Sequence, residues 1–154
     1  MDLTVLILIG ALEGAGKGAV IRGVLAAVNE CQLRVEIGDV WWIPEELSSY
    51  PGGKGRFCLV VALETPPGPQ VPARAHHVAG STSSGGGSKI VLEAGEAGLR
   101  KRTYFCFWWS GDIGIPVLVA CGRFVGKLAT ERMGEIGAAI RASRRATLKR
   151  LVGC

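Results

Sequence analysis

Hydrophobic positions along the chain gather in short apolar runs that are separated by segments rich in glycine, proline or serine. Short runs that contain many β-branched residues predict strands. The clearest run, residues 56–63 (RFCLVVAL), is apolar throughout after its arginine, which is typical of a strand buried on both faces. We expect further strands over residues 1–9, 35–43, 75–80, 89–93 and 103–109.

The remaining segments predict loops and one helix. Residues 64–74 are rich in proline and predict a long connecting loop, and residues 81–88 (STSSGGGS) predict a flexible one. The run 116–121 is apolar and short. Met133, Ile136 and Ile140 fall on one stripe of a helix near the end of the chain. Short strands, glycine-rich turns and one closing helix predict a mainly β fold with some α structure, a small barrel.

Length and charge bound the function. A chain of 154 residues predicts a single domain with a core of its own. Its net charge of +5 lies wholly beyond residue 34, in a body that also holds all the aromatic residues. A basic body with aromatic residues suits nucleic acid, although this charge is also ordinary for a soluble domain.

The cysteines and the hydropathy indicate where the protein works. Five widely spaced cysteines without a CxxC pair disfavour a disulfide scaffold or a zinc site, so we expect no metal. No apolar run reaches the roughly 18–20 residues of a membrane span. We therefore expect a cytoplasmic protein that does not bind membranes.

A glycine-rich segment near the start is similar to a phosphate-binding P-loop. Residues 10–18 (GALEGAGKG) would follow a strand and precede a helix, and Lys17 could meet a phosphate. The motif needs four residues between its first glycine and the Gly-Lys pair, whereas Gly10 leaves five. It also needs a hydroxyl after the lysine, where this chain has Gly18. A flexible turn in an N-terminal extension, residues 1–34, is the favoured interpretation.

Three stretches of the body occur in a characteristic order. They are residues 38–44 (GDVWWIP), residues 52–61 (GGKGRFCLVV) and residues 122–128 (GRFVGKL) followed by the predicted helix. Together they resemble the MazF/PemK family of toxins from type II toxin–antitoxin systems, over about residues 35–141. The family usually has proline where this chain has Phe57. Residues 1–34 match nothing in the family.

The resemblance implies a fold, a reaction and partners. The fold would be an SH3-like barrel over residues 35–154, with a C-terminal helix and a basic tail, forming a homodimer. The activity would be that of an endoribonuclease, an mRNA interferase that cleaves single-stranded RNA at specific sequences without metal or cofactor and is neutralised by an antitoxin protein. In such chemistry the 2′-OH of the RNA attacks the adjacent phosphate, so the protein supplies a cation for the phosphorane and groups that move protons.

By the same resemblance, Arg56 and Thr82 are the candidate catalytic residues. Arg56 matches the catalytic arginine of the family, and its planar fork can make two bonds to phosphate oxygens. Without the resemblance, a solvated surface arginine would be the favoured interpretation. The second catalytic residue of the family is a Thr or Ser that closes a strand before a mobile loop, and Thr82 takes that place, with Ser81 and Ser83 as alternatives.

Other residues are candidate helpers. His77 could act as a general base near neutral pH, although a surface His76-His77 pair is the favoured interpretation. Lys54, with Gly53 and Gly55, lies on the loop before Arg56 and could bind RNA. Trp42 could stack on an unpaired base or simply belong to the core.

Two other classes of function stay open. One is a non-catalytic toxin with a barrel like that of CcdB, which would bind a protein target such as gyrase through its final helix. The other, less favoured, is a nucleotide-binding protein that depends on Lys17.

Overall fold

The computed structural model describes residues 35–47, 54–65, 67–68 and 73–152 of the chain. The predicted strand over residues 1–9, the P-loop-like segment and Gly53 lie outside these residues. The strands are β1 (Asp39–Ile43), β2 (Arg56–Glu64), β3 (Arg74–Ser81), β4 (Lys89–Leu92), β5 (Thr103–Gly114) and β6 (Arg123–Lys127). The α-helices are α3 (Ile115–Cys121) and α4 (Met133–Val152), and short 3-10 turns are η2 (Glu45–Leu47), η3 (Glu96–Gly98) and η4 (Thr130–Arg132).

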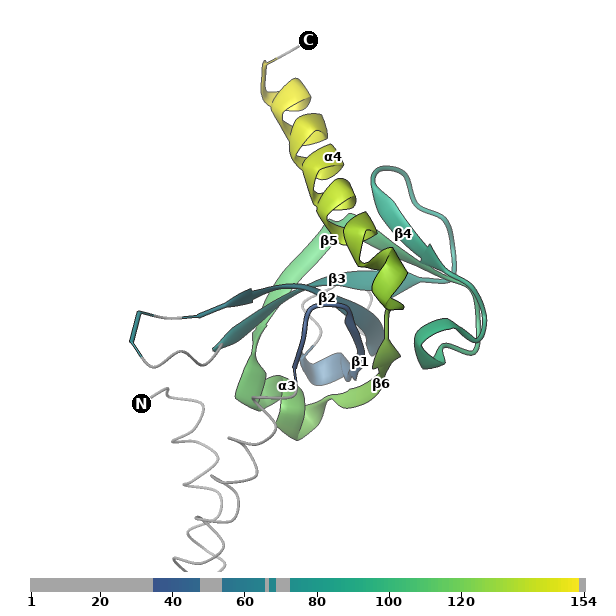
Figure 1. The fold of residues 1–154 in the computed structure, drawn as a ribbon, viewed down its shortest axis with the longest axis vertical. Helices are drawn as coiled ribbons and strands as arrows, with labels where there is room; N and C mark the ends of the chain where they lie inside the picture. Colours follow the sequence, from purple (N-terminus) through teal and green to yellow (C-terminus); the bar gives the residue numbers. More distant parts are fainter. Residues whose placement is uncertain (1–34, 48–53, 66, 69–72, 153–154) are drawn as a thin grey trace, which may run out of the picture.

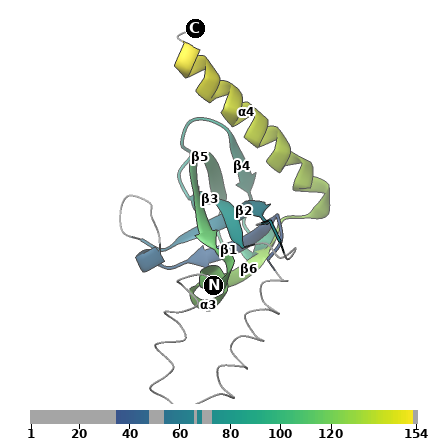
Figure 2. The same cartoon turned by 90° about the vertical axis from the view of Figure 1, so that its left-hand side faces the viewer.

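All six strands belong to one antiparallel sheet in the order β4-β5-β3-β2-β1-β6. The sheet curls strongly into a half-barrel, with β4 and β6 as its two edges (Figure 1). The 90° view shows α4 lying over one side of the curl and α3 at the opposite end of the molecule (Figure 2). The prediction of a mainly β fold with a C-terminal helix is therefore confirmed.

Both faces of the sheet are buried, which explains the uninterrupted apolar run of β2. Leu59 and Val61 point into a core that α4 covers through Ile136. Cys58 and Val60 point to the other face, into a second core. Because successive residues of a strand face opposite sides, a strand between two cores needs apolar residues at every position.

Two segments differ from simple expectation. The apolar run 116–121 forms α3, whose first turn contains Pro116, a position where proline costs no hydrogen bond. Residues 123–127 form the edge strand β6, although half-exposed side chains and Gly126 give it no alternating pattern. Its partner β1 defines it, through a pairing that includes Val40 with Gly126.

The first half of helix α4 packs on the core, and its second half, as far as the structure describes it, does not. Its predicted apolar stripe is confirmed: Ile136 is buried, and Met133 and Ile140 pack against the same core. The Ser88 hydroxyl donates a hydrogen bond to the Ala139 carbonyl (2.9 Å). Beyond that point the helix leaves the sheet and projects away from it (Figure 1). Within the described residues, no helix is long and apolar enough to span a membrane.

Candidate functional site

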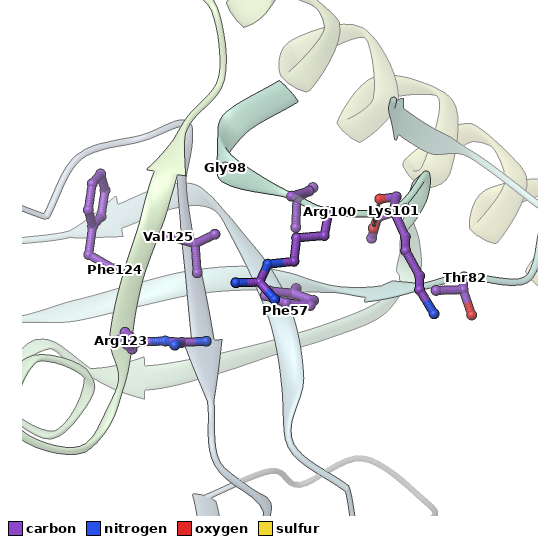
Figure 3. A pocket seen from close by; sticks show the side chains of 10 residues that line it. Phe57, Thr82, Gly98, Arg100, Lys101, Arg123, Phe124 and Val125 are labelled. Atoms are coloured by element: carbon purple, nitrogen blue, oxygen red, sulfur yellow. Dashed lines mark hydrogen bonds between the residues drawn. The ribbon is translucent and has the colours of Figure 1, made fainter. Parts of the chain in front are cut away.

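A pocket of about 620 Å³ opens where β2 begins and β3 ends, next to the edge strand β6 (Figure 3). Phe57, the second residue of β2, and Thr103, the first of β5, line it, and Thr82 follows the last residue of β3. The other lining residues come from the end of η3, the segment after it and β6: Gly98, Leu99, Arg100, Lys101, Arg123, Phe124 and Val125.

The pocket is strongly positive. Arg100, Lys101 and Arg123 all line it, all three are exposed, and none of the lining residues is acidic. Arg100 and Arg123 approach from opposite walls across Phe57, and Lys101 lies on the side of Thr82 (Figure 3). Phe124 also lines the pocket, but its exposed ring packs edge-on against Trp41, with ring centroids 5.6 Å apart, and points away from Phe57 and Arg100 (Figure 3). The pocket thus combines cations, a threonine and the aromatic ring of Phe57.

Close backbone packing fixes the wall that carries Arg100 and Lys101. A side chain at Gly98 would place its Cβ 2.3 Å from the carbonyl oxygen of Val125, and Gly98 also has a φ of 73°. One at Gly126 would lie 2.4 Å from the carbonyl oxygen of Ala97. The η3 segment can therefore lie directly on β6 only because both positions are glycine.

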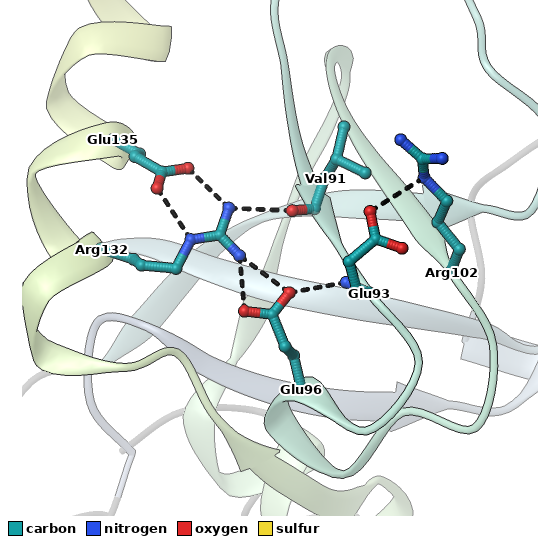
Figure 4. A network of polar contacts seen from close by, with 6 residues as sticks. All are labelled: Val91, Glu93, Glu96, Arg102, Arg132 and Glu135. Carbon is teal, nitrogen blue, oxygen red and sulfur yellow. Dashed lines mark hydrogen bonds and ion pairs between the residues drawn. The ribbon is translucent and has the colours of Figure 1, made fainter.

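An ion-pair network ties the same wall to α4 (Figure 4). Arg132 donates to both carboxylate oxygens of Glu96 (2.8 and 2.9 Å), to both of Glu135 (2.8 Å each) and to the carbonyl of Val91 (2.8 Å). Glu96 also accepts a bond from the backbone N–H of Glu93 (2.6 Å), which together with Arg132 lowers the pKa of its carboxyl group. Arg132 thereby joins β4, η3 and α4, and orients the segment that leads to the pocket.

The two predicted catalytic residues lie at the same end of the β2–β3 ladder. Cys58 pairs with Ala79, so alternation places Arg56 and Ser81 on the sheet face of that pair. Thr82, by contrast, lines the pocket with Phe57 on the other face. The Arg56 guanidinium lies over the ring of Trp109, 4.9 Å from its centroid. Arg56 is not among the residues that line the pocket.

The serine-rich loop after β3 is locally ordered by its own polar groups. The hydroxyl oxygens of Ser81 and Ser83 lie 3.0 Å apart, and the backbone N–H of Ser83 donates to Ser81 (3.2 Å). The Lys89 ammonium donates to the Ser84 hydroxyl (2.8 Å) and to the Gly85 carbonyl (2.7 Å). Ser81 and Ser83 therefore bond to each other, whereas Thr82 lines the edge of the pocket.

The structure separates the predicted helper residues. His77 is only 5% exposed, between β2 and β5, and burial lowers the pKa of its imidazole. Trp42 packs edge-on against Phe57, with ring centroids 4.9 Å apart, and the absence of a side chain at Gly55 leaves room for its ring. Lys54 is exposed, two residues before the start of β2. None of these residues lines the pocket.

The sequence of this chain matches none of the known protein-family models, and no curated protein matches it. A functional proposal for this chain therefore rests on the residues of the pocket and on the resemblance to the MazF/PemK family.

Sequence reasoning missed the basic residues of the pocket. The signal for Arg100 and Lys101 is a run of consecutive cations, residues 100–102, directly before the predicted strand 103–109, in a segment for which no element or role was predicted. Arg123 stood inside one of the family-like stretches and received no role. Among the described residues, no three His, Cys, Asp or Glu side chains gather as a metal site would require.

Proposed function

We propose that this protein is a metal-independent endoribonuclease that binds single-stranded RNA in the pocket between η3 and β6. The observation that carries the proposal is that Arg100, Lys101, Arg123 and Thr82 line one pocket without an acidic lining residue. Such a pocket favours a phosphodiester, since each cation can bond phosphate oxygens. The ring of Phe57 adds a surface on which an unpaired base can stack.

The proposed reaction needs no nucleophile from the protein. The RNA 2′-oxygen attacks the adjacent phosphorus and forms the new P–O bond, the P–O5′ bond breaks, and the products carry a 2′,3′-cyclic phosphate and a 5′-OH. Arg100 and Arg123 would hold the two non-bridging oxygens while negative charge grows on them. The proton of the 2′-OH would pass to solvent water as the new P–O bond forms. Lys101 would supply a proton to the leaving 5′-oxygen and regain one from water, and the Thr82 hydroxyl would hydrogen-bond a phosphate oxygen.

The end of the β2–β3 ladder offers a second arrangement on the opposite face. There Arg56 and Ser81 share a side of the sheet, as the family resemblance would require of a catalytic cation and hydroxyl. We favour the Thr82 pocket because it has the volume that an RNA strand needs, three cations and the aromatic ring of Phe57. The two arrangements make opposite predictions for four single variants.

The experiment measures cleavage of a mixed-sequence single-stranded RNA by the purified protein in the presence of EDTA. We expect Thr82→Ala and Lys101→Gln to lower the cleavage rate at least tenfold, and Ser81→Ala to leave it within about twofold. Arg102→Gln is the matched control, because Arg102 neighbours Lys101 but pairs with Glu93 (3.2 Å) and does not line the pocket.

The outcomes separate the possibilities. Loss of cleavage in Arg56→Ala and Ser81→Ala, with normal rates in Thr82→Ala and Lys101→Gln, would move the reaction to the Arg56 face. Absence of cleavage of every RNA by the wild-type protein, at concentrations where its fold is intact by circular dichroism, would overturn the proposal.

A further inference from the structure

A second pocket, of about 330 Å³, lies between the serine- and glycine-rich loop and the projecting part of α4. Its walls are small: Gly86, Gly87 and Ser88 on the loop side, and Ser143, Ala146 and Thr147 on the helix side. The one large side chain that lines it is Trp108 of β5. The Trp108 side chain is 54% exposed, which is unusual for an indole in a protein of this size.

The pocket is preformed rather than a gap beside a loose loop. Ser88 bonds to α4 through its hydroxyl, and its carbonyl accepts a hydrogen bond from the N–H of Phe107 (3.0 Å). Lys89 holds the other end of the loop. Behind the indole, the ring of Trp109 lies 4.4 Å from that of Trp108. The loop glycines Gly85 and Gly87 also approach the indole, so the ring is held in place between Trp109 and the loop while part of it stays open to solvent.

The projecting part of α4 is basic. From Ile136 to the end of α4 the sequence contains no acidic residue, whereas it contains Arg141, Arg144 and Arg145, all three exposed. The helical period places Arg141 and Arg145 on the side of α4 away from the lining residues, whereas Arg144 directly follows Ser143 and lies nearer to the pocket. An aromatic ring with a nearby cation is an arrangement that single-strand-binding proteins use for a stacked base and its phosphate.

We propose that the Trp108 pocket is a base-binding subsite for single-stranded RNA, separate from the pocket that holds Thr82. One unpaired base would stack on the Trp108 ring, and Arg144 would contact the adjoining phosphate. The loop 82–88 borders both pockets, since Thr82 lines the first and Gly86 the second. One RNA strand can therefore follow this loop from one pocket to the other. The inference rests on the proposed function for the identity of the nucleic acid.

The test measures binding of a fluorescently labelled, non-cleavable 2′-O-methyl oligouridine of about 12 nucleotides, a length within the range that single-strand sites cover. We expect Trp108→Ala to weaken binding roughly 5- to 150-fold, as the loss of one stacked base does. Ala146→Trp places a large side chain in the pocket and leaves Trp108 itself unchanged, and it should weaken binding to a similar degree. Ala138→Trp is the matched control, because Ala138 is exposed on α4 and does not line the pocket.

A matched oligomer without bases separates stacking from charge. If the inference is correct, the abasic oligomer binds wild type and Trp108→Ala equally. Unchanged affinity for oligouridine in both Trp108→Ala and Ala146→Trp overturns it. Cleavage that depends on Lys101 but not on Trp108 would refute this subsite alone. Binding that depends on Trp108 without any cleavage would refute the proposed function alone.

Discussion

Replacement of Arg132 tests whether one side chain holds the wall of the first pocket. In Arg132→Met the apolar stem is kept, and the bonds to Glu96, Glu135 and the Val91 carbonyl are lost. The substitution removes the link between α4, η3 and β4 without opening a large cavity. The segment that carries Arg100 and Lys101 then keeps only its packing on β6.

The magnitude follows from the exposure of the groups. The Arg132 side chain is 23% exposed, against 37% for Glu96 and 45% for Glu135, so each ion pair is partly screened by solvent. Pairs of this kind contribute about 0.5–1 kcal/mol each, and the bond to the part-buried Val91 carbonyl adds about 1 kcal/mol. We expect a loss of about 2–3 kcal/mol in the free energy of unfolding. For a domain of this length the midpoint of thermal unfolding falls by about 4–12 °C.

Urea unfolding followed by circular dichroism measures this loss. Arg132→Lys should recover little of it, because a single ammonium cannot bond Glu96, Glu135 and Val91 in one plane. Arg102→Met is the control: its ion pair with Glu93 is more than half exposed on both sides, and its loss should cost under about 0.5 kcal/mol. Equal stability of Arg132→Met and Arg102→Met would refute the reasoning.

The same network predicts a pH dependence with a definite sign. Hydrogen bonds to the backbone of Glu93 and to Arg132 lower the pKa of Glu96, and Arg132 lowers the pKa of Glu135. Because both pKa values lie below the ordinary 4.5, this stabilisation is present above that pH and is lost as the pH falls through the lowered values. The difference between wild type and Arg132→Met should therefore shrink in acid, and a constant difference down to full protonation would contradict it.

Three further predictions concern buried groups. Burial raises the pKa of Asp39 to about 6, so its carboxyl destabilises the fold as the pH rises through that value; chemical denaturation should find Asp39→Asn gaining about 2–3 kcal/mol on wild type between pH 4 and pH 8. A gain that does not change with pH would contradict this. Gly80→Ala should cost about 1–3 kcal/mol in the same assay, because the new Cβ would lie 2.7 Å from a methyl carbon of Thr103; no loss would mean that the strand shifts freely. Brief alkylation followed by peptide mapping should modify the exposed Cys121 and spare Cys58, whose burial raises its pKa to about 12; modification of Cys58 in the folded protein would show that its core opens.

The elements that the sequence predicted well are those whose own pattern determines them. β2 is apolar at successive positions because both faces of its strand are covered, and α4 carries its stripe at Met133, Ile136 and Ile140. β6 was not predicted, since an edge strand with Gly126 and exposed neighbours owes its existence to pairing with β1. Its conformation is a property of the sheet more than of its residues.

The candidate site was predicted only in part, for a similar reason. Thr82 was proposed through the family resemblance, and the structure places it at the pocket. Arg100 and Arg123 are far apart in sequence and meet only because η3 packs on β6. Because neighbouring residues of a strand point to opposite faces of the sheet, Arg56 and Phe57 lie on different faces. A sequence motif that contains both residues therefore does not show on which face of the sheet the pocket lies.

The most direct test of the account is the chemical identity of the ends that the protein leaves on RNA. Single-stranded RNA is treated with purified protein in EDTA, and the fragments are sequenced by methods that distinguish 5′-OH from 5′-phosphate and cyclic from open 3′-phosphates. The account predicts 5′-OH and 2′,3′-cyclic phosphate ends that form with wild type and Arg102→Gln, and that disappear with Lys101→Gln. Ends bearing 5′-phosphate and 3′-OH, or cleavage that persists unchanged in Lys101→Gln and Thr82→Ala, would contradict it.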